Sequence, residues 1–386
     1  MPMKILVFCE TFAPPTITFI YNEVNTLAQN NDVLVLTTKR INKDLFPFEK
    51  TIEIPFYSHN IDYRIRKTLR ANDFELGSKK NSFAKKIRKV VTDFQPDVIH
   101  CHFGYESWLF LLNFPQQKIP IFLHFHGFDA SHKLRNSRYC ATLNKLLKRT
   151  DVTPIFVSNF MHQNVEKHLK RKIENCKLLY YGTDCNFFIR TQKQPEKKPF
   201  VFLQISSFAE KKGHEFTVKA FRKLVEKNPN LDGKMIFGGD GTLRKEIENL
   251  TQELDIQHLV EFLGTINRQQ AKELMETAHC FVHHSVTSST VGDMEGVPNA
   301  IMEAMSMQLP ILSTFHSGIP ELVENEKHGF LVKERDIEDY ATKMQEILSW
   351  NYLPENRQKV IENFEKQQHG KLLESYYHEK TNPIIP

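Results

Sequence analysis

Glycine is nearly absent from the first quarter of the chain. Gly77 is the only glycine among the first hundred residues, and the turn after the first apolar run reads ETFAPPTITFI. A dinucleotide-binding domain has G-x-G-x-x-G at this turn, because glycines let the backbone approach the pyrophosphate closely. The absence disfavours a dehydrogenase that binds NAD or FAD in the usual place.

Several other signals are also missing. No run of about 18 apolar residues occurs, so we expect no transmembrane helix, and the first residues lack the features of a signal peptide. The six cysteines are scattered without a C-x-x-C pair, which disfavours zinc sites and disulfide frameworks and favours a reducing cytoplasm. No D-x-D run accompanies a set of ligands, so we expect neither a metal nor a cofactor.

Short apolar runs alternate with amphipathic stretches along the chain. Runs such as DVLVLTT and IPIFLHFH suit parallel strands buried on both faces, and the stretches between them suit helices. The alternation stops at a polar, proline-containing segment, residues 190–199, and then restarts. Because 386 residues are too many for one compact core, we predict two doubly wound α/β domains, 1–190 and 198–364, with that segment as an exposed linker.

The segment EGVPNAIMEAM, residues 295–305, reads as a buried helix that begins unusually. Pro298 suits the first turn of a helix, where its missing N–H costs nothing. The N–H groups of Gly296, Val297 and Asn299 are then free at the helix mouth. A helix start of this kind attracts anions and suits a diphosphate.

Two glutamates flank this helix start. Glu303 lies about 7–8 Å along the helix axis from Pro298, given a rise of 1.5 Å per residue. Ligands of such sheets bind beyond the carboxyl ends of the strands, so we expect a cleft between the two domains there. A carboxylate deeper in that cleft suits a vicinal diol such as ribose, and Glu295 suits the hydroxyls of an attached sugar.

Other strand ends also carry candidate residues. Lys212 precedes Gly213 at the entry of a predicted helix, where an ammonium group can meet a phosphate. Gly239 lies in the glycine-rich sequence FGGDG, which a structural turn explains about as well as close approach of a ligand does.

The first domain offers weaker candidates. His126 ends a predicted strand before a glycine and Asp129, and a histidine there is either functional or structural. Phe103 and Gly104, after another strand, are placed to line the acceptor side. Thr16 and Thr18 begin a predicted helix and suit either an anion site or a simple N-cap.

Positive charge is concentrated between residues 61 and 90. Ten lysines and arginines face three acidic residues there, which leaves a net charge of +7. The segment is either a solvated helix face or a surface that rests on anionic lipid headgroups or receives a phosphate-bearing acceptor. No recognised nucleic-acid-binding motif accompanies the charge, so we expect no nucleic-acid partner.

With these motifs the chain resembles the retaining glycosyltransferases of family 4, which have the GT-B fold of two Rossmann-like domains. EGVPNAIMEAM matches the E-x7-E motif of that family, and EKKGHEF, GGDGTLRKEIENL, SGIPELV and HFHGFD also match. The resemblance covers nearly the whole chain. It is closest to bacterial exopolysaccharide and capsule enzymes of the colanic-acid type.

The resemblance implies a role for several residues. Glu303 would hold the donor ribose, Glu295 would contact the donor sugar near its reacting carbon, and Lys212 would neutralise the donor diphosphate. His126 would face the donor sugar from the first domain. The last helix, about residues 365–386, would return to the first domain. The backbone that would meet the nucleobase is that of Gly264, Thr265 and Ile266.

The chain departs from the family at two positions. An arginine usually accompanies the lysine on the diphosphate, and Ser207 stands at its position. The Gly-Gly loop of the first domain is replaced by PPTITF. Another cation such as Arg268 would have to compensate, or the chain has become a catalytically impaired binder of sugar nucleotides. A GT-B sugar-nucleotide epimerase is a further alternative.

The expected function is therefore metal-independent transfer of a hexose with retention of configuration. The donor would be a nucleoside-diphosphate sugar, with UDP favoured over GDP. The acceptor would be a saccharide or a lipid-diphosphate-linked saccharide in cell-surface polysaccharide synthesis. We expect a cytoplasmic location, with peripheral contact to the inner membrane face through the basic residues 64–89.

Overall fold

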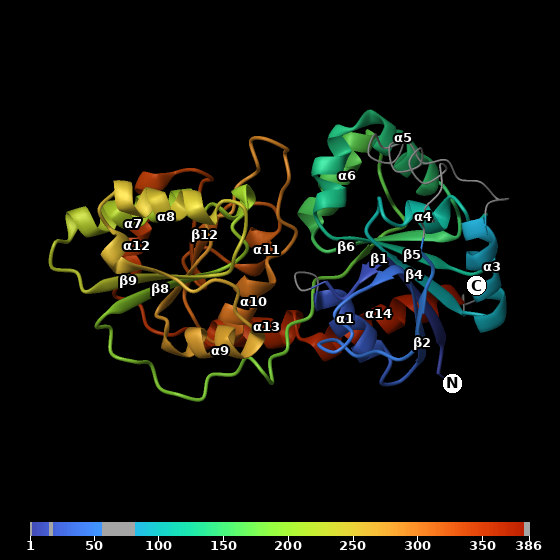
Figure 1. Cartoon of the computed structure of the whole chain (residues 1–386), viewed down its shortest axis with the longest axis horizontal. Coiled ribbons are helices and arrows are strands. Elements are labelled where there is room, and N and C mark those ends of the chain that lie inside the picture. The colour runs from blue at the N-terminus through green and yellow to red at the C-terminus, as the bar shows by residue number, and fades with distance from the viewer. Residues whose placement is uncertain (1, 15–17, 56–81, 382–386) are drawn as a thin grey trace. The chain divides into compact units, whose positions relative to one another are not determined.

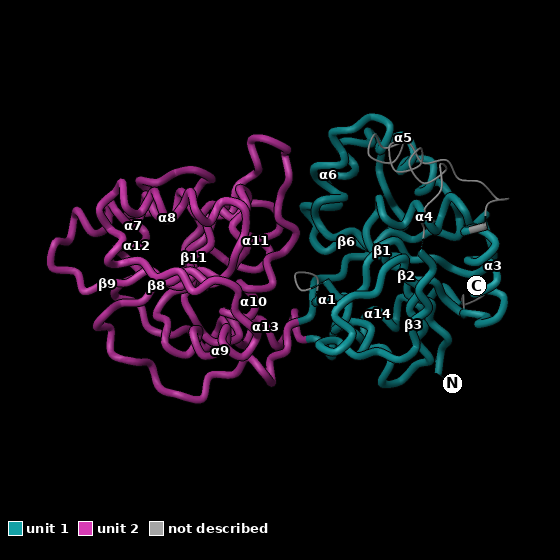
Figure 2. Tube along the Cα trace, viewed as in Figure 1, with its two compact units in different colours: residues 1–182, 366–386 teal, residues 183–365 magenta. Residues whose placement is uncertain are grey.

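The computed structural model describes residues 2–14, 18–55 and 82–381. The chain divides into two compact units, shown in Figure 2: unit 1 is Met1–Gly182 with Lys366–Pro386, and unit 2 is Thr183–Glu365. Each unit contains a parallel sheet with helices on both faces, which confirms the predicted doubly wound α/β class (Figure 1).

The described part of unit 1 holds a seven-stranded sheet in which all neighbouring strands are parallel. The strand order is β3-β2-β1-β4-β5-β6-β7, so the order reverses between β1 and β4. β4 and β5 are buried along their whole length, as expected of strands covered on both faces. The strands are β1 (Lys4–Phe12), β2 (Asp32–Arg40), β3 (Thr51–Glu53), β4 (Val98–His102), β5 (Ile121–Phe125), β6 (Val152–Phe156) and β7 (Lys177–Leu178).

Helices cover both faces of this sheet (Figure 1). One face packs against α1 and the last helix of the chain, α14, through a core that includes Val7, Val24 and Leu373. The helices of unit 1 are α1 (Thr18–Leu27), α3 (Ser82–Phe94), α4 (Trp108–Leu111), α5 (Ser137–Leu146), α6 (Asn159–Leu169) and α14 (Lys366–Thr381), with short 3-10 turns η1 (Phe128–Ala130) and η2 (His132–Arg135).

Unit 2 repeats the arrangement with a six-stranded parallel sheet. The order β10-β9-β8-β11-β12-β13 reverses between β8 and β11. Helices α7, α8 and α12 cover one face, and α9, α10 and α13 cover the other (Figure 1). The strands are β8 (Phe200–Ile205), β9 (Gly233–Gly238), β10 (Val260–Phe262), β11 (Cys280–Val282), β12 (Ile311–Thr314) and β13 (Gly329–Val332). The helices are α7 (His214–Lys227), α8 (Arg244–Glu253), α9 (Arg268–Thr277), α10 (Asn299–Ser306), α11 (Ile319–Leu322), α12 (Ile337–Ile347) and α13 (Pro354–Asn363), with 3-10 turns η3 (Glu210–Lys212) and η4 (Gln257–Leu259).

Residues 190–199 lie along unit 2, where the sequence suggested an exposed linker. The Arg190 guanidinium lies 3.6 Å from the centre of the Tyr352 ring and donates to the carbonyls of Met275, Glu276 and Met307. These carbonyls end α9 and follow α10, where helices leave acceptors unpaired and attract cations. The boundary between the units falls earlier, after Gly182.

The C-terminal segment of the chain forms two helices. α13 ends at Asn363, and α14 begins at Lys366 in unit 1. Between them the N–H group of Thr183 donates to the carbonyl of Phe364 at 2.7 Å. The two passages of the chain between the units therefore lie side by side.

The basic segment is described only in its second part, because residues 64–81 lie outside the described residues. Within α3, Lys85 and Lys86 are exposed, and the Lys89 ammonium lies 2.8 Å from the Asp93 carboxylate. Among the described residues, no helix is both long enough and apolar enough to cross a membrane.

The start of β13 provides a test of unit 2 packing. Gly329 has φ +141°, and a Cβ atom there would lie 1.8 Å from the Ile311 carbonyl oxygen. We predict that Gly329→Ala lowers the free energy of unfolding by about 2–4 kcal/mol, through strain and overpacking. Urea unfolding would be followed by the fluorescence of Trp350, which packs against Phe330, with Trp108→Phe in every protein.

Gly233→Ala is the matched control. A Cβ atom at Gly233 meets only the flexible Leu231 side chain, at 3.1 Å. The control is expected to cost no more than about 1 kcal/mol. Equal losses for the two variants would contradict the steric argument.

Candidate functional site

The candidate site in unit 2 lies where its strand order reverses. The loop after β8 carries Lys212, and the loop after β11 carries Glu295 and leads into α10. At the reversal point, the connection after one strand runs to one side of the sheet and the connection after its neighbour runs to the other side. The ends of these two neighbouring strands therefore stay uncovered. The fold thus brings together two motifs that are about eighty residues apart in the sequence.

Lys212 and Glu295 form an ion pair at this point. The Lys212 ammonium lies 2.7 Å from Oε1 of Glu295, and both side chains are largely buried. Burial alone would raise the pKa of the Glu295 carboxyl. The Lys212 and Lys211 ammonium groups lower this pKa by more than burial raises it, so that it is about 2. Glu295 therefore stays ionised at any physiological pH.

Buried groups next to Lys212 fix the position of its backbone. The Gln204 side chain is fully buried, donates to the Lys212 carbonyl at 2.9 Å and accepts from the Thr217 hydroxyl at 3.1 Å. Gly213 has φ +61°, and a Cβ atom there would lie 1.7 Å from the His284 carbonyl oxygen. Only glycine lets the β8 loop pack this closely against the β11 loop.

Glu295 is held through its backbone by a histidine. The N–H group of Glu295 donates to Nε2 of His316 at 3.0 Å, so Nδ1 of His316 carries the proton and donates to Glu334 at 2.6 Å. Burial raises the pKa of Glu334, whereas hydrogen bonds from His316 and Thr287 lower it to about 2. A permanently charged acid thus sets the His316 tautomer, which in turn fixes the Glu295 loop.

A second acid ties the same loop to the turn η3. The Glu210 carboxylate accepts hydrogen bonds of 2.5–2.6 Å from Ser288, Ser289 and Thr290. Burial raises the pKa of Glu210, but these hydrogen bonds lower it to about 2. Glu210 lies two residues before Lys212, so the loop is anchored beside the ion pair.

The start of α10 has the predicted free donors. Among the described residues, the N–H groups of Gly296, Val297 and Asn299 make no hydrogen bond. Pro298, the residue before the helix, provides no side-chain cap. Oδ1 of Asn299 is buried and also without a hydrogen-bond partner in this part of the chain. This helix mouth can bind an anion, because its positive end is unsatisfied.

Glu303 lies in the second turn of α10 and differs from the other three acids. Among the described residues no hydrogen bond or ion pair reaches its carboxylate. Burial raises the pKa of Glu303 to about 7, and the distant positive charge of Arg268 only partly offsets this. An unpaired, partly buried carboxylate of this kind is suited to accept hydrogen bonds from ligand hydroxyls.

The glycine-rich end of β9 meets the end of β10. Gly239 has φ +135°, and its N–H group donates to the Gly264 carbonyl at 2.8 Å. A Cβ atom on Gly239 would lie 2.0 Å from the Ser206 carbonyl oxygen, so a structural turn is sufficient reason for this glycine. Thr265 is exposed, and Ile266 packs against Gly238. The residues expected to meet a nucleobase thus lie together.

Ser207, which stands where the family has an arginine, is exposed. The Arg268 guanidinium lies 2.9 Å from the Asp184 carboxylate and 4.0 Å from the centre of the Phe187 ring, so it is already engaged. Lys211 is nearer to the ion pair: its ammonium lies 2.8 Å from Asp293 and lowers the pKa of Glu295. It is the stronger candidate for the second positive charge.

Unit 1 buries the first-domain candidate His126. Nε2 of His126 lies 3.0 Å from Nδ1 of His102, and its Nδ1 lies 2.9 Å from the Tyr181 hydroxyl. The ring is 8% exposed and packs against Phe19 and Phe103. The role of His126 at a donor sugar stays a prediction. Its contacts inside unit 1 show how the ring is oriented.

Asp129 connects the loops after β4 and β5. Its carboxylate accepts from the N–H groups of Gly104 at 2.7 Å and of His126 and Gly127 at 3.0 Å. Asp129 is fully buried, so it positions these two loops from inside. Thr18 is the first residue of α1, and Thr16 lies outside the described residues.

Comparison with known families agrees with this arrangement. Residues 18–187 match the model described as Glycosyltransferase Family 4, and residues 186–367 match the model described as Glycosyl transferases group 1. The chain belongs to glycosyltransferase family 4. The family resemblance inferred from the motifs is therefore confirmed.

Individual relatives extend the comparison. A protein of Escherichia coli K12, provisionally named the colanic acid biosynthesis glycosyltransferase WcaL, is 30% identical over 260 residues, which are 66% of this chain and 62% of that protein. A glycosyltransferase from Rickettsia africae has a TM-score of 0.75 at 19% identity and covers 99% of both chains. HepE of Anabaena, solved with UDP and glucose, has a TM-score of 0.68 at 18% identity over 97% of this chain and 99% of its own. These two structures share the GT-B fold with this family 4 member.

The sequence did not reveal the three groups that hold the family 4 site in place. Glu210, His316 and Glu334 make their contacts with residues 18 to 80 positions away. Glu210 had one signal, its place in EKKGHEF next to Lys212. Nothing in the local pattern around Glu334 marked it, because acidic residues after a strand are common.

The raised pKa of Glu303 predicts an unusual pH dependence of stability. Between about pH 4.5 and pH 7 the folded chain holds a proton on Glu303 that the unfolded chain has lost, so stability falls as pH rises through this window. Glu303→Gln removes this loss. We predict that at pH 8 the variant exceeds the wild type in free energy of unfolding by about 1 kcal/mol, and that the difference disappears near pH 4.5.

Urea unfolding at the two pH values measures this effect. Glu253→Gln, at an exposed position of α8, is the control and should show no such pH dependence. A Glu303→Gln variant that is less stable than the wild type at pH 8 would mean that the carboxylate has a stabilising partner.

Proposed function

We propose that the chain transfers a hexose from a nucleoside-diphosphate sugar to a hydroxyl acceptor with retention of configuration. The observation that carries the proposal is the arrangement around α10. The charged Lys212–Glu295 pair precedes α10, the first N–H groups of α10 make no hydrogen bond among the described residues, and Glu303 lies in its second turn. Together they match the parts of such a donor.

The donor diphosphate fits the positive end of the site. Lys212 and Lys211 supply two ammonium groups from the loop after β8, and on this proposal Lys211 takes the role of the missing family arginine at Ser207. A diphosphate that binds here would pair with the Lys212 ammonium, which now pairs with the Glu295 carboxylate. Fixed donors of this kind need no reorganisation when charge develops on the leaving group.

The ribose and the sugar fit the two glutamates. Glu303 would accept hydrogen bonds from a vicinal diol, which would hold the carboxylate in its ionised form and lower its raised pKa. Glu295 would contact the donor hexose, and the backbone at Gly264–Ile266 would meet the base. The family pattern alone suggests that His126, in unit 1, contacts the donor sugar.

The reaction requires cleavage at the anomeric carbon. The bond to the diphosphate breaks with its electron pair on the leaving oxygen, while positive charge grows on the sugar. The acceptor oxygen forms the new bond on the same face, and its proton passes to the leaving phosphate. Positive groups on the diphosphate lower this barrier, and exclusion of water protects the donor from hydrolysis.

The relatives favour a UDP-sugar donor and a polysaccharide pathway. HepE was solved with UDP and glucose, and the Escherichia coli relative is named for colanic acid biosynthesis. On this basis we propose a UDP-hexose, with a GDP-sugar as second choice, and a saccharide or lipid-diphosphate-linked saccharide as acceptor. Ser207 supports one rival, a protein that binds the sugar nucleotide without turnover.

Variants of Lys212 and Glu303 test the proposal. We predict that one of the UDP-, GDP-, ADP- and dTDP-sugars raises the melting temperature and that its nucleotide is slowly released. Lys212→Ala should lower kcat about 10²–10³-fold, because the lost charge acts mainly on the transition state. Glu303→Ala should mainly raise KM, because ribose binding is the same in ground and transition states.

Nucleotide release and thermal shift are the two measurements. Lys227→Ala, at the exposed end of α7, is the control for loss of a lysine and should behave as the wild type. Stabilisation by a donor without any release, even with candidate acceptors, would favour the binding protein over the transferase. No stabilisation by any donor would contradict both.

We further propose that the basic residues 64–89 rest on anionic lipid headgroups. The support in the described part is α3, with Lys85 and Lys86 exposed on its polar face. We predict that Lys85→Glu with Lys86→Glu lowers binding to phosphatidylglycerol vesicles by at least about thirtyfold, at roughly 1 kcal/mol for each lysine removed and more for reversal. Sedimentation with neutral vesicles is the control. Unchanged binding to the anionic vesicles would reject the proposal.

A further inference from the structure

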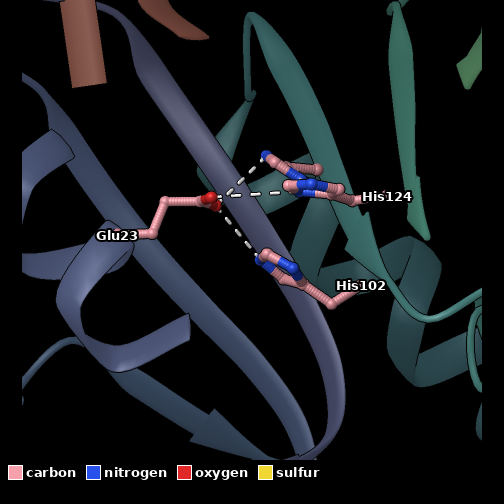
Figure 3. Close-up of side chains that lie close together, drawn as sticks. Glu23, His102 and His124 are labelled. Carbon is pink, nitrogen blue, oxygen red and sulfur yellow. Dashed lines mark hydrogen bonds and ion pairs between the residues drawn. The ribbon is translucent and has the colours of Figure 1, made fainter. Parts of the chain in front are cut away.

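Unit 1 contains a cluster of four buried, metal-ligating side chains that the proposed function does not use. Glu23 on α1 points at His102 on β4 and His124 on β5 (Figure 3), and His100 on β4 completes the group. The three histidines are fully buried and Glu23 is 5% exposed. One ligand atom from each of the four lies within 4.8 Å of all the others.

The backbone explains why these side chains converge. His100 and His102 are two apart on one strand, so they point to the same face of the sheet. His124 pairs in register with His102 on the neighbouring parallel strand and faces the same way. α1 covers this face, and Glu23 lies among its buried residues.

We propose that this cluster binds one divalent transition-metal ion of the zinc type, with Glu23, His100, His102 and His124 as its ligands. Oε1 of Glu23 lies 3.3 Å from Nε2 of His102 and 3.6 Å from Nδ1 of His100, and Oε2 lies 3.9 Å from Nδ1 of His124. Ligand atoms about 2.0–2.1 Å from a tetrahedral ion are about 3.3 Å apart. Small side-chain rotations therefore suffice.

Poorly satisfied buried atoms support a ligand at the centre. Among the described residues, Oε1 of Glu23 and Nε2 of His102 are buried and face each other at 3.3 Å, and neither has another hydrogen-bond partner. Native interiors rarely leave buried polar atoms so poorly satisfied, because each one is costly. An ion between the carboxylate and the imidazoles would satisfy Glu23 and His102 directly.

A second layer of groups orients the ligands. Nε2 of His369 on α14 lies 3.0 Å from Oε2 of Glu23, and Nδ1 of His102 lies 3.0 Å from Nε2 of His126. Such outer partners fix the tautomer of a ligating histidine and hold a ligating carboxylate. The Tyr377 hydroxyl contacts Nδ1 of His100, which is the proposed ligand atom of this ring. This contact has to break when the ion binds.

The first test is metal binding by the full chain, purified without a histidine tag and stripped with a chelator. We expect one equivalent of Co²⁺ to bind and to give the visible absorption of a four-coordinate ion. Zn²⁺ should displace it, and should raise the melting temperature by about 5–10 °C at a hundredfold excess over its Kd. Folding of the stripped protein is checked by circular dichroism.

Matched variants locate the ion. His102→Gln and Glu23→Gln should abolish the Co²⁺ absorption and the Zn²⁺ shift, whereas His168→Gln, at an exposed position on α6, should retain both. Tyr377→Phe removes a hydroxyl but no ligand, so it should bind Co²⁺ as well as the wild type or more tightly. In a simple hydrogen-bond network, Tyr377→Phe would lose stability and Zn²⁺ would not restore it.

Two results would overturn the proposal. One is folded wild-type chain that binds less than a tenth of an equivalent of Co²⁺. The other is binding that persists in His102→Gln and disappears in His168→Gln, which would place the ion on the surface. The wild-type titration decides the question even when a ligand variant fails to fold.

Discussion

The reversal of strand order in each parallel sheet is the constraint on which the rest of the structure depends. At β8 and β11 it leaves two strand ends uncovered and places Lys212 beside Glu295 and the mouth of α10. The same reversal occurs between β1 and β4 in unit 1. The chain uses these two equivalent places differently, with charged groups and free N–H donors in unit 2 and aromatic and imidazole rings in unit 1.

Pairing of buried charge explains why Glu303 stands out. Glu210, Glu295 and Glu334 are each held ionised by hydrogen bonds or lysines, and each has a pKa of about 2. Their partners connect the β8 and β11 loops and the residues after β12 and β13. Glu303 has no such partner among the residues that the structure describes, and its pKa is about 7. A protein interior leaves a carboxylate in this state only where a ligand or a proton completes it.

The sequence predicted what depends on local pattern and missed what depends on distant pairing. The α/β class and the α10 motif follow from periodicity and from the proline and glycine positions. The polar composition of residues 190–199 predicted an exposed linker, and most of these residues are exposed, yet Arg190 finds acceptors at two helix ends. The histidine cluster had a local signal, two H-x-H patterns on buried strands, but Glu23 is far from both in the sequence.

The histidine cluster and His126 form one connected network within unit 1. If His102 binds a metal through Nε2, its proton is on Nδ1 and is donated to Nε2 of His126 at 3.0 Å. His126 then carries its own proton on Nδ1, which faces the Tyr181 hydroxyl at 2.9 Å. The tautomer and tilt of His126 would thus be set by the cluster below it. If His126 contacts the donor sugar, as proposed above, a buried ion would act on that contact only by orienting the ring.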